Sequence, residues 1–386
     1  MSNLPRYNPN PLAFLNGAAE KGHRPSPTAP TAYVGPRAAV AAPTEEPAAA
    51  LISAEQVLVE MAYAWEHVDA NGSPTHYPTL DKHWLWQPGE ACAVTGWPGM
   101  GKSLCELNKM VIKSVYDGWK WALFVPENMP IRKAVGILAQ AYVGRSVNPR
   151  HAHRMSRAEY DDAVKWVTGH FQFIDPRQAH SLKTLLPAVK AAKKFGIKGW
   201  LLDPWNDLES KLGEFSGMMS EQLKSQLGLV LDFTKDEQLC TIICVHPAGE
   251  ARNAKTMELK IPDQYSMEGG RMWPNRMDSI CVWHRPMADE DPTDCAVDFY
   301  VKKMRNEPES GFKTPKQGVR LDYERRTYRY LDPLLGMSPL DPKMIQRYRE
   351  TGSNLLAAPT ANRSPLAPER MTFHALPPST FDRPTA

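Results

Sequence analysis

The chain has 386 residues, with 46 Lys and Arg against 43 Asp and Glu, and its formal net charge is +3. A balance this close to neutral excludes a uniformly basic protein that coats DNA, although a local basic groove stays compatible with it. No apolar run reaches the roughly 18 residues of a membrane span, and the first residues lack the charged start and apolar stretch of a secretory signal. We therefore expect no membrane partner and no secretion.

The cysteines indicate a reducing compartment. None of them forms a CxxC pair, and most lie in apolar, strand-like runs, which favours buried reduced thiols over a disulfide framework or a zinc site. They are Cys92, Cys105, Cys240, Cys244, Cys281 and Cys295. We expect a cytoplasmic protein of a bacterial or phage-infected cell.

The distribution of proline predicts the domain organisation. Nine of the 35 prolines lie in residues 1–50 and six in residues 351–386. Both ends are poor in large apolar residues, so they cannot bury enough surface to offset the entropy of ordering. We expect a disordered Pro/Ala-rich tail at 1–50, a linker or interface helix within 51–75, an ordered domain at 76–335, and a C-terminal helix with a disordered tail at 336–386.

The first predicted element is a helix over 53–68. Ser53 and Gln56 have the spacing of a capping box, and Val57, Met61 and Trp65 recur on one face. Two interpretations stay open: a core helix, or an interface helix against a neighbouring subunit.

Strands and helices alternate through the rest of the ordered region. Strands are predicted at 91–96, 121–126, 170–175, 199–204, 240–246, 279–284, 296–302 and 319–324, and helices at 102–116, 131–143, 157–171, 182–195 and 220–233. Alternation of this kind predicts an α/β fold with a mainly parallel, doubly wound sheet. The last three strands have no clear helix between them, which predicts an antiparallel extension at one edge.

A phosphate-binding loop follows the first strand. The motif GxxxxGK[ST] is met by the run Gly96, Trp97, Pro98, Gly99, Met100, Gly101, Lys102 and Ser103, which opens the helix predicted at 102–116. Leu104, the next residue, is a further nucleotide-binding candidate. The glycines let backbone N–H groups point at phosphate oxygens, and the helix N-terminus adds partial positive charge. Lys102 is predicted to reach the β- and γ-phosphates of ATP, and Ser103 to bind Mg²⁺.

Polar residues end the other strands, where ligands gather in doubly wound sheets. Asp203 is predicted to hold Mg²⁺, and Glu127 to orient and deprotonate the attacking water. His246 is placed to contact the γ-phosphate. Arg305 follows an edge strand within a charge run, and the sequence alone favours a solvated arginine there over one that completes a neighbour's site. Each of the other roles has an alternative. Asp203 could cap a turn, and Glu127 could be a solvated surface residue. His246 could be a hydrogen-bonded histidine at a strand tip.

Together these segments resemble the RecA-like motor of DnaB-type hexameric replicative helicases, especially the phage primase–helicase and Twinkle-like branch. The resemblance runs from about Thr79 to Tyr330. It rests on TLDKHWLWQPGEACAVTGWPGMGKS (79–103), DGWKWALFVPENMP (117–130), GIKGWLLDPWNDLE (196–209), CTIICVHPAG (240–249), MEGGRMWPNRMDSICVWHRP (267–286), with Asn275, Asp278 and Arg285 at matching places, and YVKKMRNEPESG (300–311).

The resemblance implies roles for the matching residues. Glu127 takes the place of the catalytic base, Asp203 of the Walker B acid and His246 of the γ-phosphate sensor, while Lys303 and Arg305 take positions that reach into the adjacent subunit's site. It also implies a homo-oligomeric ring, usually of six subunits. No cysteine lies before Cys92 and no upstream primase region is apparent, so primase activity is not expected. The run Gly269-Gly270-Arg271 departs from the family's usual loop sequence, which leaves the DNA contacts open.

Two loops, 205–220 and 247–277, are candidates to hold single-stranded DNA in the ring's channel. The second carries the basic candidates Arg252, Lys255, Lys260, Arg271 and Arg276. The leading hypothesis is an ATP hydrolase acting as a replicative DNA helicase, with a separate primase, polymerase or loader as further candidate partners. The alternatives are a RecA-like DNA-dependent ATPase that mediates recombination without unwinding, and a nucleotide-gated loader or scaffold.

Overall fold

The computed structural model describes residues 52–66, 72–208, 219–249, 251–253, 259–291 and 293–352. The predicted tails at 1–50 and beyond 352 lie outside these ranges, as do Lys255 and most of the loop 205–220. The helix predicted first is α1 (Ala54–Glu66), and its capping box is formed, since Ser53 and Gln56 exchange side-chain and backbone hydrogen bonds. Its large apolar side chains are exposed, Trp65 by 87%.

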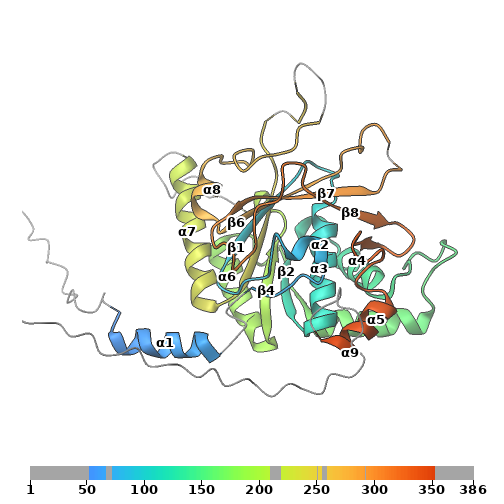
Figure 1. The fold of residues 1–386 in the computed structure, drawn as a ribbon, viewed down its shortest axis with the longest axis horizontal. Helices are drawn as coiled ribbons and strands as arrows, with labels where there is room; N and C mark the ends of the chain where they lie inside the picture. Colours follow the sequence, from blue (N-terminus) through green and yellow to red (C-terminus); the bar gives the residue numbers. More distant parts are fainter. Residues whose placement is uncertain are drawn as a thin grey trace, which may run out of the picture. The chain divides into compact units, whose positions relative to one another are not determined.

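In the described part of the chain the strands form one nine-stranded sheet, in the order β3-β2-β4-β5-β1-β6-β7-β8-β9 (Figure 1). The parallel part comprises β1 (Ala91–Thr95), β2 (Lys120–Phe124), β3 (Phe171–Phe173), β4 (Ile197–Leu202), β5 (Cys240–Val245) and β6 (Ser279–His284). The antiparallel edge comprises β7 (Ala296–Met304), β8 (Val319–Glu324) and β9 (Arg329–Leu331). The predicted mainly parallel sheet with an antiparallel extension is therefore confirmed.

Helices cover both faces of this sheet. They are α2 (Pro78–Asp81), α3 (Lys102–Asp117), α4 (Arg132–Val143), α5 (Arg157–His170), α6 (Leu182–Ala192), α7 (Met219–Glu237), α8 (Met272–Arg276) and α9 (Pro342–Thr351), with 3₁₀ turns η3 (Pro126–Asn128), η4 (Lys193–Phe195) and η5 (Trp205–Asp207). The short elements α2, α8 and β9 were not predicted.

Alternate residues of the central strand β1 face two separate cores, as the pleat of a strand requires. Cys92 and Val94 pack with α3, α4 and α5, whereas Ala91 and Ala93 pack with α6, α7 and α8. Figure 1 shows these two groups of helices on opposite sides of the sheet. Because β1 is buried on both faces, its sequence is a nearly continuous apolar run without polar alternation.

Candidate functional site

The loop between β1 and α3 has the geometry of a phosphate-binding loop. A Cβ at Gly96 would lie 2.4 Å from the Trp283 carbonyl oxygen, so only glycine fits there. Gly101 caps α3 with a φ of 84°, the left-handed region that glycine adopts readily. The Lys102 ammonium is buried and donates to the Gly96 carbonyl at 2.8 Å, which folds the side chain over its own loop. This loop is thus shaped to surround an anion with N–H groups.

Asp203 lies beside this loop at the carboxyl end of β4. Asp203 is 3% exposed, and the side chains of Ser103 and Cys244 lie next to its carboxylate. Burial raises the pKa of Asp203. Its Oδ2 atom is buried and has no hydrogen-bond partner among the described residues. An unpartnered carboxylate oxygen next to a serine hydroxyl supplies the hard oxygen ligands that Mg²⁺ prefers, so these residues fit the predicted ion.

Glu127 and His246 meet at the same edge of the sheet. Glu127 lies in η3 after β2, and its Oε1 atom is 3.4 Å from Nε2 of His246, which follows β5. The glutamate is half exposed and so open to solvent. Nearby, burial and then the charge of Glu127 raise the pKa of Asp207.

Asn206 connects this edge to both predicted DNA loops, and it was missed at the level of sequence. Its Oδ1 accepts from the backbone N–H of His246 at 3.0 Å, and its side-chain amide donates to Glu268. Glu268 in turn donates its backbone N–H to the His246 carbonyl at 3.2 Å. Asn206 belongs to η5, at the start of the loop 205–220, and Glu268 to the loop 247–277. The three residues form a closed ring of contacts behind the predicted γ-phosphate sensor.

A second contact joins the phosphate-binding loop to the loop 247–277. The Trp97 indole N–H donates to the Lys260 carbonyl at 2.7 Å, and Trp97 is 7% exposed. Among the other candidate DNA-binding residues, Arg252 is paired with Asp289, and the carbonyl of Arg276 accepts from Arg305. The side chains of Lys260 and Arg271 are exposed.

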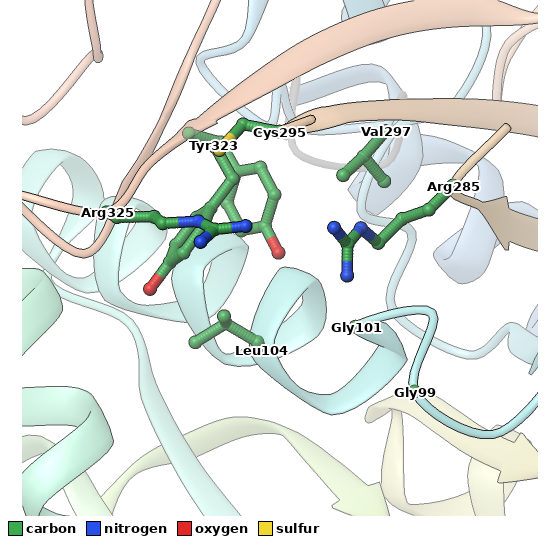
Figure 2. A pocket seen from close by; sticks show the side chains of 9 residues that line it. Gly99, Gly101, Leu104, Arg285, Cys295, Val297, Tyr323 and Arg325 are labelled. Atoms are coloured by element: carbon green, nitrogen blue, oxygen red, sulfur yellow. The ribbon is translucent and has the colours of Figure 1, made fainter. Parts of the chain in front are cut away.

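A pocket of about 180 Å³ opens next to the phosphate-binding loop (Figure 2). Figure 2 shows Arg285 and Arg325 reaching into it from opposite sides above Leu104, with Tyr323 beside Arg325. Arg285 is held in place because its guanidinium donates to the Asp294 carbonyl at 2.7 Å. Gly99, Gly101, Cys295, Val297 and Tyr330 complete the lining. Aromatic, apolar and arginine side chains here suit a base and ribose. Of these residues the sequence had pointed only to Gly99, Gly101, Leu104 and Arg285.

Lys303 and Arg305 lie at the opposite end of β1 from the phosphate-binding loop. Arg305 donates to the Asp278 carboxylate at 2.6 Å, and Asp278 also accepts from the backbone N–H of Ala91, the first residue of β1. Lys303 donates to the Pro274 and Met277 carbonyls. Since β1 has five residues at about 3.3 Å each, the two ends are roughly 16 Å apart. The structure therefore does not bring Lys303 or Arg305 to the phosphate-binding loop of their own chain.

Comparisons with known proteins agree with this architecture. No family model matches the chain. The chain is 28% identical over 306 residues to the Twinkle homolog protein, chloroplastic/mitochondrial, of Arabidopsis thaliana, a match that covers 75% of this chain and 40% of that protein. The chain thus spans less than half the length of this curated relative.

Two solved structures share the fold. An ATPase domain that was solved on its own superposes with a TM-score of 0.57 at 14% identity, covering 72% of this chain and 98% of that domain. A DnaB-like replicative helicase, described with its interactions with primase, gives a TM-score of 0.56 at 15% identity, covering 72% of this chain and 67% of that chain.

Fold and loop together define an α/β domain with the RecA-like fold and a phosphate-binding loop motif between β1 and α3. More particularly, the chain is similar in sequence to the Twinkle homolog over 306 residues, and it shares its fold with the ATPase domain and with the DnaB-like replicative helicase. Among the described helices, none combines the length and apolar character needed to cross a membrane.

Proposed function

We propose that this chain is an ATP-driven, ring-forming replicative DNA helicase that translocates on single-stranded DNA and hydrolyses Mg-ATP between neighbouring subunits. One observation carries the proposal. The nucleotide-facing groups gather at the carboxyl end of β1, while Arg305 is held at its amino end. Because Arg305 lies at the other end of β1 from the nucleotide-facing groups, a nucleotide site that includes this arginine needs a second copy of the chain to supply it.

The chain's own residues suit the steps of phosphoryl transfer to water. The phosphate-binding loop and Lys102 hold the β- and γ-phosphates, and Tyr323 and Arg325 hold the base. Ser103 and Asp203 would hold Mg²⁺, which would neutralise charge on the phosphates. Glu127, open to solvent and beside His246, accepts the proton of the attacking water. Arg305 of a neighbouring subunit stabilises charge on the transferring phosphoryl group, with Lys303 fixing the strand that presents it.

The coupling to DNA follows from the contacts behind His246. Loss of the γ-phosphate changes the position of His246, and Asn206 passes that change to Glu268 and the loop 247–277. The basic residues Arg252, Lys255, Lys260, Arg271 and Arg276 are the candidates for the phosphates of the bound strand.

Partners and compartment follow from the relatives and the thiols. The relative named Twinkle homolog and the DnaB-like fold support a hexameric helicase of the phage or organellar type, and interaction with a primase is described for the DnaB-like helicase that shares the fold. A polymerase and a loader stay candidate partners. Six unpaired thiols favour a reducing compartment such as a bacterial or phage-infected cytoplasm.

The test is unwinding of a forked duplex with ATP and Mg²⁺, in parallel with ATPase rates with and without single-stranded DNA. Lys102→Ala is the inactive control. Unwinding that is lost in this variant supports a helicase. DNA-stimulated hydrolysis without unwinding would favour the recombination-mediator alternative, and no hydrolysis under ring-forming conditions would leave the loader or scaffold.

A further inference from the structure

The loop between α4 and α5 is strongly basic and has no part in the ATP site. From Gly144 to Arg157, the first residue of α5, the chain contains four arginines and two histidines and no acidic residue. These basic residues are Arg145, Arg150, His151, His153, Arg154 and Arg157. All six are exposed. Within these 14 residues the four arginine charges are not balanced by any acidic residue.

The backbone of this loop is ordered by its own hydrogen bonds. Ser146 is 2% exposed, and its N–H donates to the His153 carbonyl at 3.1 Å, while its carbonyl accepts from Met155 at 2.8 Å. Met155 is buried in the core under α5. The two ends are thus fixed together beneath the loop, and Arg150 and His151 lie at its tip. Because the backbone is already ordered, binding there costs little backbone entropy.

A second basic segment joins this loop from the turn between β8 and β9. The Tyr328 hydroxyl lies 3.1 Å from Nδ1 of His151. The partly buried Arg329 guanidinium donates to the Ala141 carbonyl at 2.8 Å and to the Tyr142 carbonyl, which fixes β9 to the end of α4. Arg325 and Arg326 precede this contact and are exposed. We call Arg145, Arg150, His151, His153, Arg154 and Arg326 the α4–α5 basic surface.

Few acids oppose this surface. Glu159 pairs with Arg145, and the Glu324 carboxylate accepts from the Thr327 hydroxyl. Within the described ranges, no ion pair joins an acid to the guanidinium of Arg150 or Arg326. Both side chains therefore keep their charge available for a ligand.

The surface lies on the other face of the sheet from the predicted channel loops. It is attached to α4 and α5, which pack on one core, whereas the loops 205–220 and 247–277 lead into α7 and α8, which pack on the other. A DNA strand held by the channel loops of a subunit therefore lies across that subunit's sheet from the α4–α5 basic surface.

We propose that the α4–α5 basic surface binds the phosphate backbone of a second DNA strand, the single strand that the ring does not encircle. Arginine and histidine on an ordered loop recognise phosphate through charge and hydrogen bonds without reading sequence. A bound protein segment would need apolar anchors to reach a similar affinity, and the exposed groups of this surface are almost all charged or imidazole. The identification of the second strand rests on the proposed function; the affinity for DNA does not.

The test compares two double variants that each remove two positive charges. Arg150→Ala with Arg326→Ala alters the surface, and Lys194→Ala with Lys198→Ala removes two exposed lysines from η4 and β4 as the matched control. Binding of the full chain to a labelled duplex is measured by fluorescence anisotropy without hydrolysis, using substrates with one single-stranded arm or two.

The wild type and the control should bind the two-armed fork several-fold more tightly than the substrate with one arm. The Arg150/Arg326 variant should lose this preference and keep its affinity for one arm. Its salt slope on the fork should fall by about 1.4, since each phosphate contact on a single strand contributes roughly 0.7.

An Arg150/Arg326 variant with the wild-type affinity and salt slope on the fork would overturn the inference and leave an acidic protein segment as the ligand of this surface. An equal loss in both double variants would also overturn it, because the effect would then be one of net charge. Absence of unwinding by the wild type would count against the proposed function alone, since the binding comparison requires no hydrolysis.

Discussion

Each end of β1 has a basic side chain near an aspartate. The two aspartates differ in whether their carboxylate oxygens have hydrogen-bond partners. At the carboxyl end, Lys102 bonds the carbonyl of its own loop, and Asp203 keeps a buried oxygen without a partner among the described residues. At the amino end, Arg305 and Asp278 form an ion pair at 2.6 Å, and both oxygens of Asp278 are engaged. A buried polar atom without a partner costs free energy, so we expect it where a ligand will satisfy it.

This difference indicates which end of the strand binds a ligand and which end is satisfied within the subunit. The carboxyl end presents groups that a nucleotide and its ion would satisfy. The amino end is already paired, yet Arg305 is 41% exposed, and in the proposed ring it would exchange Asp278 for a ligand on a neighbour. The following variants test this contrast, in order of decreasing expected effect.

Removal of the Arg305 guanidinium should have the largest effect. Arg305→Ala is expected to lower kcat for ATP hydrolysis about 10³-fold or more, the contribution typical of an arginine finger. Steady-state ATPase assays under ring-forming conditions measure it. Lys316→Ala, which removes an exposed charge from the loop after β7, should hydrolyse ATP at the wild-type rate. A kcat within tenfold of wild type for Arg305→Ala would remove Arg305 from the site.

Asp203→Asn should lower hydrolysis and raise stability together. Hydrolysis should fall about 100-fold, because an amide binds Mg²⁺ poorly. Burial raises the pKa of Asp203 in the folded protein, so its carboxylate opposes folding increasingly as pH rises above its ordinary value of 3.8. The variant should therefore melt a few degrees above wild type at pH 8, a gain of about 1 kcal/mol, and the gap should narrow toward pH 5. Thermal melts at both pH values measure this, and a lower melting temperature at pH 8 would contradict it.

Loss of the Asn206 amide should separate hydrolysis from DNA. Asn206→Ala is expected to lower the DNA-stimulated rate about tenfold, the equivalent of one hydrogen bond, and the basal rate far less. Glu268→Ala should give the same defect, and the double variant should be no worse, because the two side chains act through one contact. Steady-state ATPase assays with and without single-stranded DNA measure both rates. Additive losses would show that the two residues act independently.

The smallest effect concerns the pocket beside the phosphate-binding loop. Cys295 lines it and is half-buried, whereas the other five cysteines are buried. A maleimide should therefore label one thiol per native chain, and ATP should slow that labelling several-fold. Cys295→Ser should abolish it. Labelling at an unchanged rate in saturating ATP would place the base elsewhere.

The sequence was sufficient for the elements whose stability is local or uniformly buried. β1, its glycine-rich loop and α3 could be predicted because an apolar run, a glycine pattern and a helix period coincide. α8 and β9 could not. α8 has five residues with Pro274 among them, and β9 has three residues held by pairing with β8 and by the buried Tyr330. Such elements form because of tertiary contacts, which local patterns do not contain.

The site divides in the same way. Lys102, Asp203, Glu127 and His246 each end or follow a predicted strand, so the rule for doubly wound sheets placed them together. Tyr323 and Arg325 reach the pocket only through the antiparallel register of β7 and β8. Asn206 resembles an ordinary turn residue in the sequence, and its significance depends on a contact 40 residues away. Contacts of this kind required the structure.

The most direct test of a shared ATP site is to mix two inactive variants. Lys102→Ala lacks the group proposed to hold phosphate, and Arg305→Ala lacks the group proposed to act on the neighbour. In mixed rings from equal amounts, about a quarter of the interfaces pair an intact Lys102 with an intact Arg305. We predict that ATPase activity returns on mixing, to roughly that fraction, while each variant alone stays inactive. Mixed rings that form and hydrolyse no ATP would contradict a site shared between subunits.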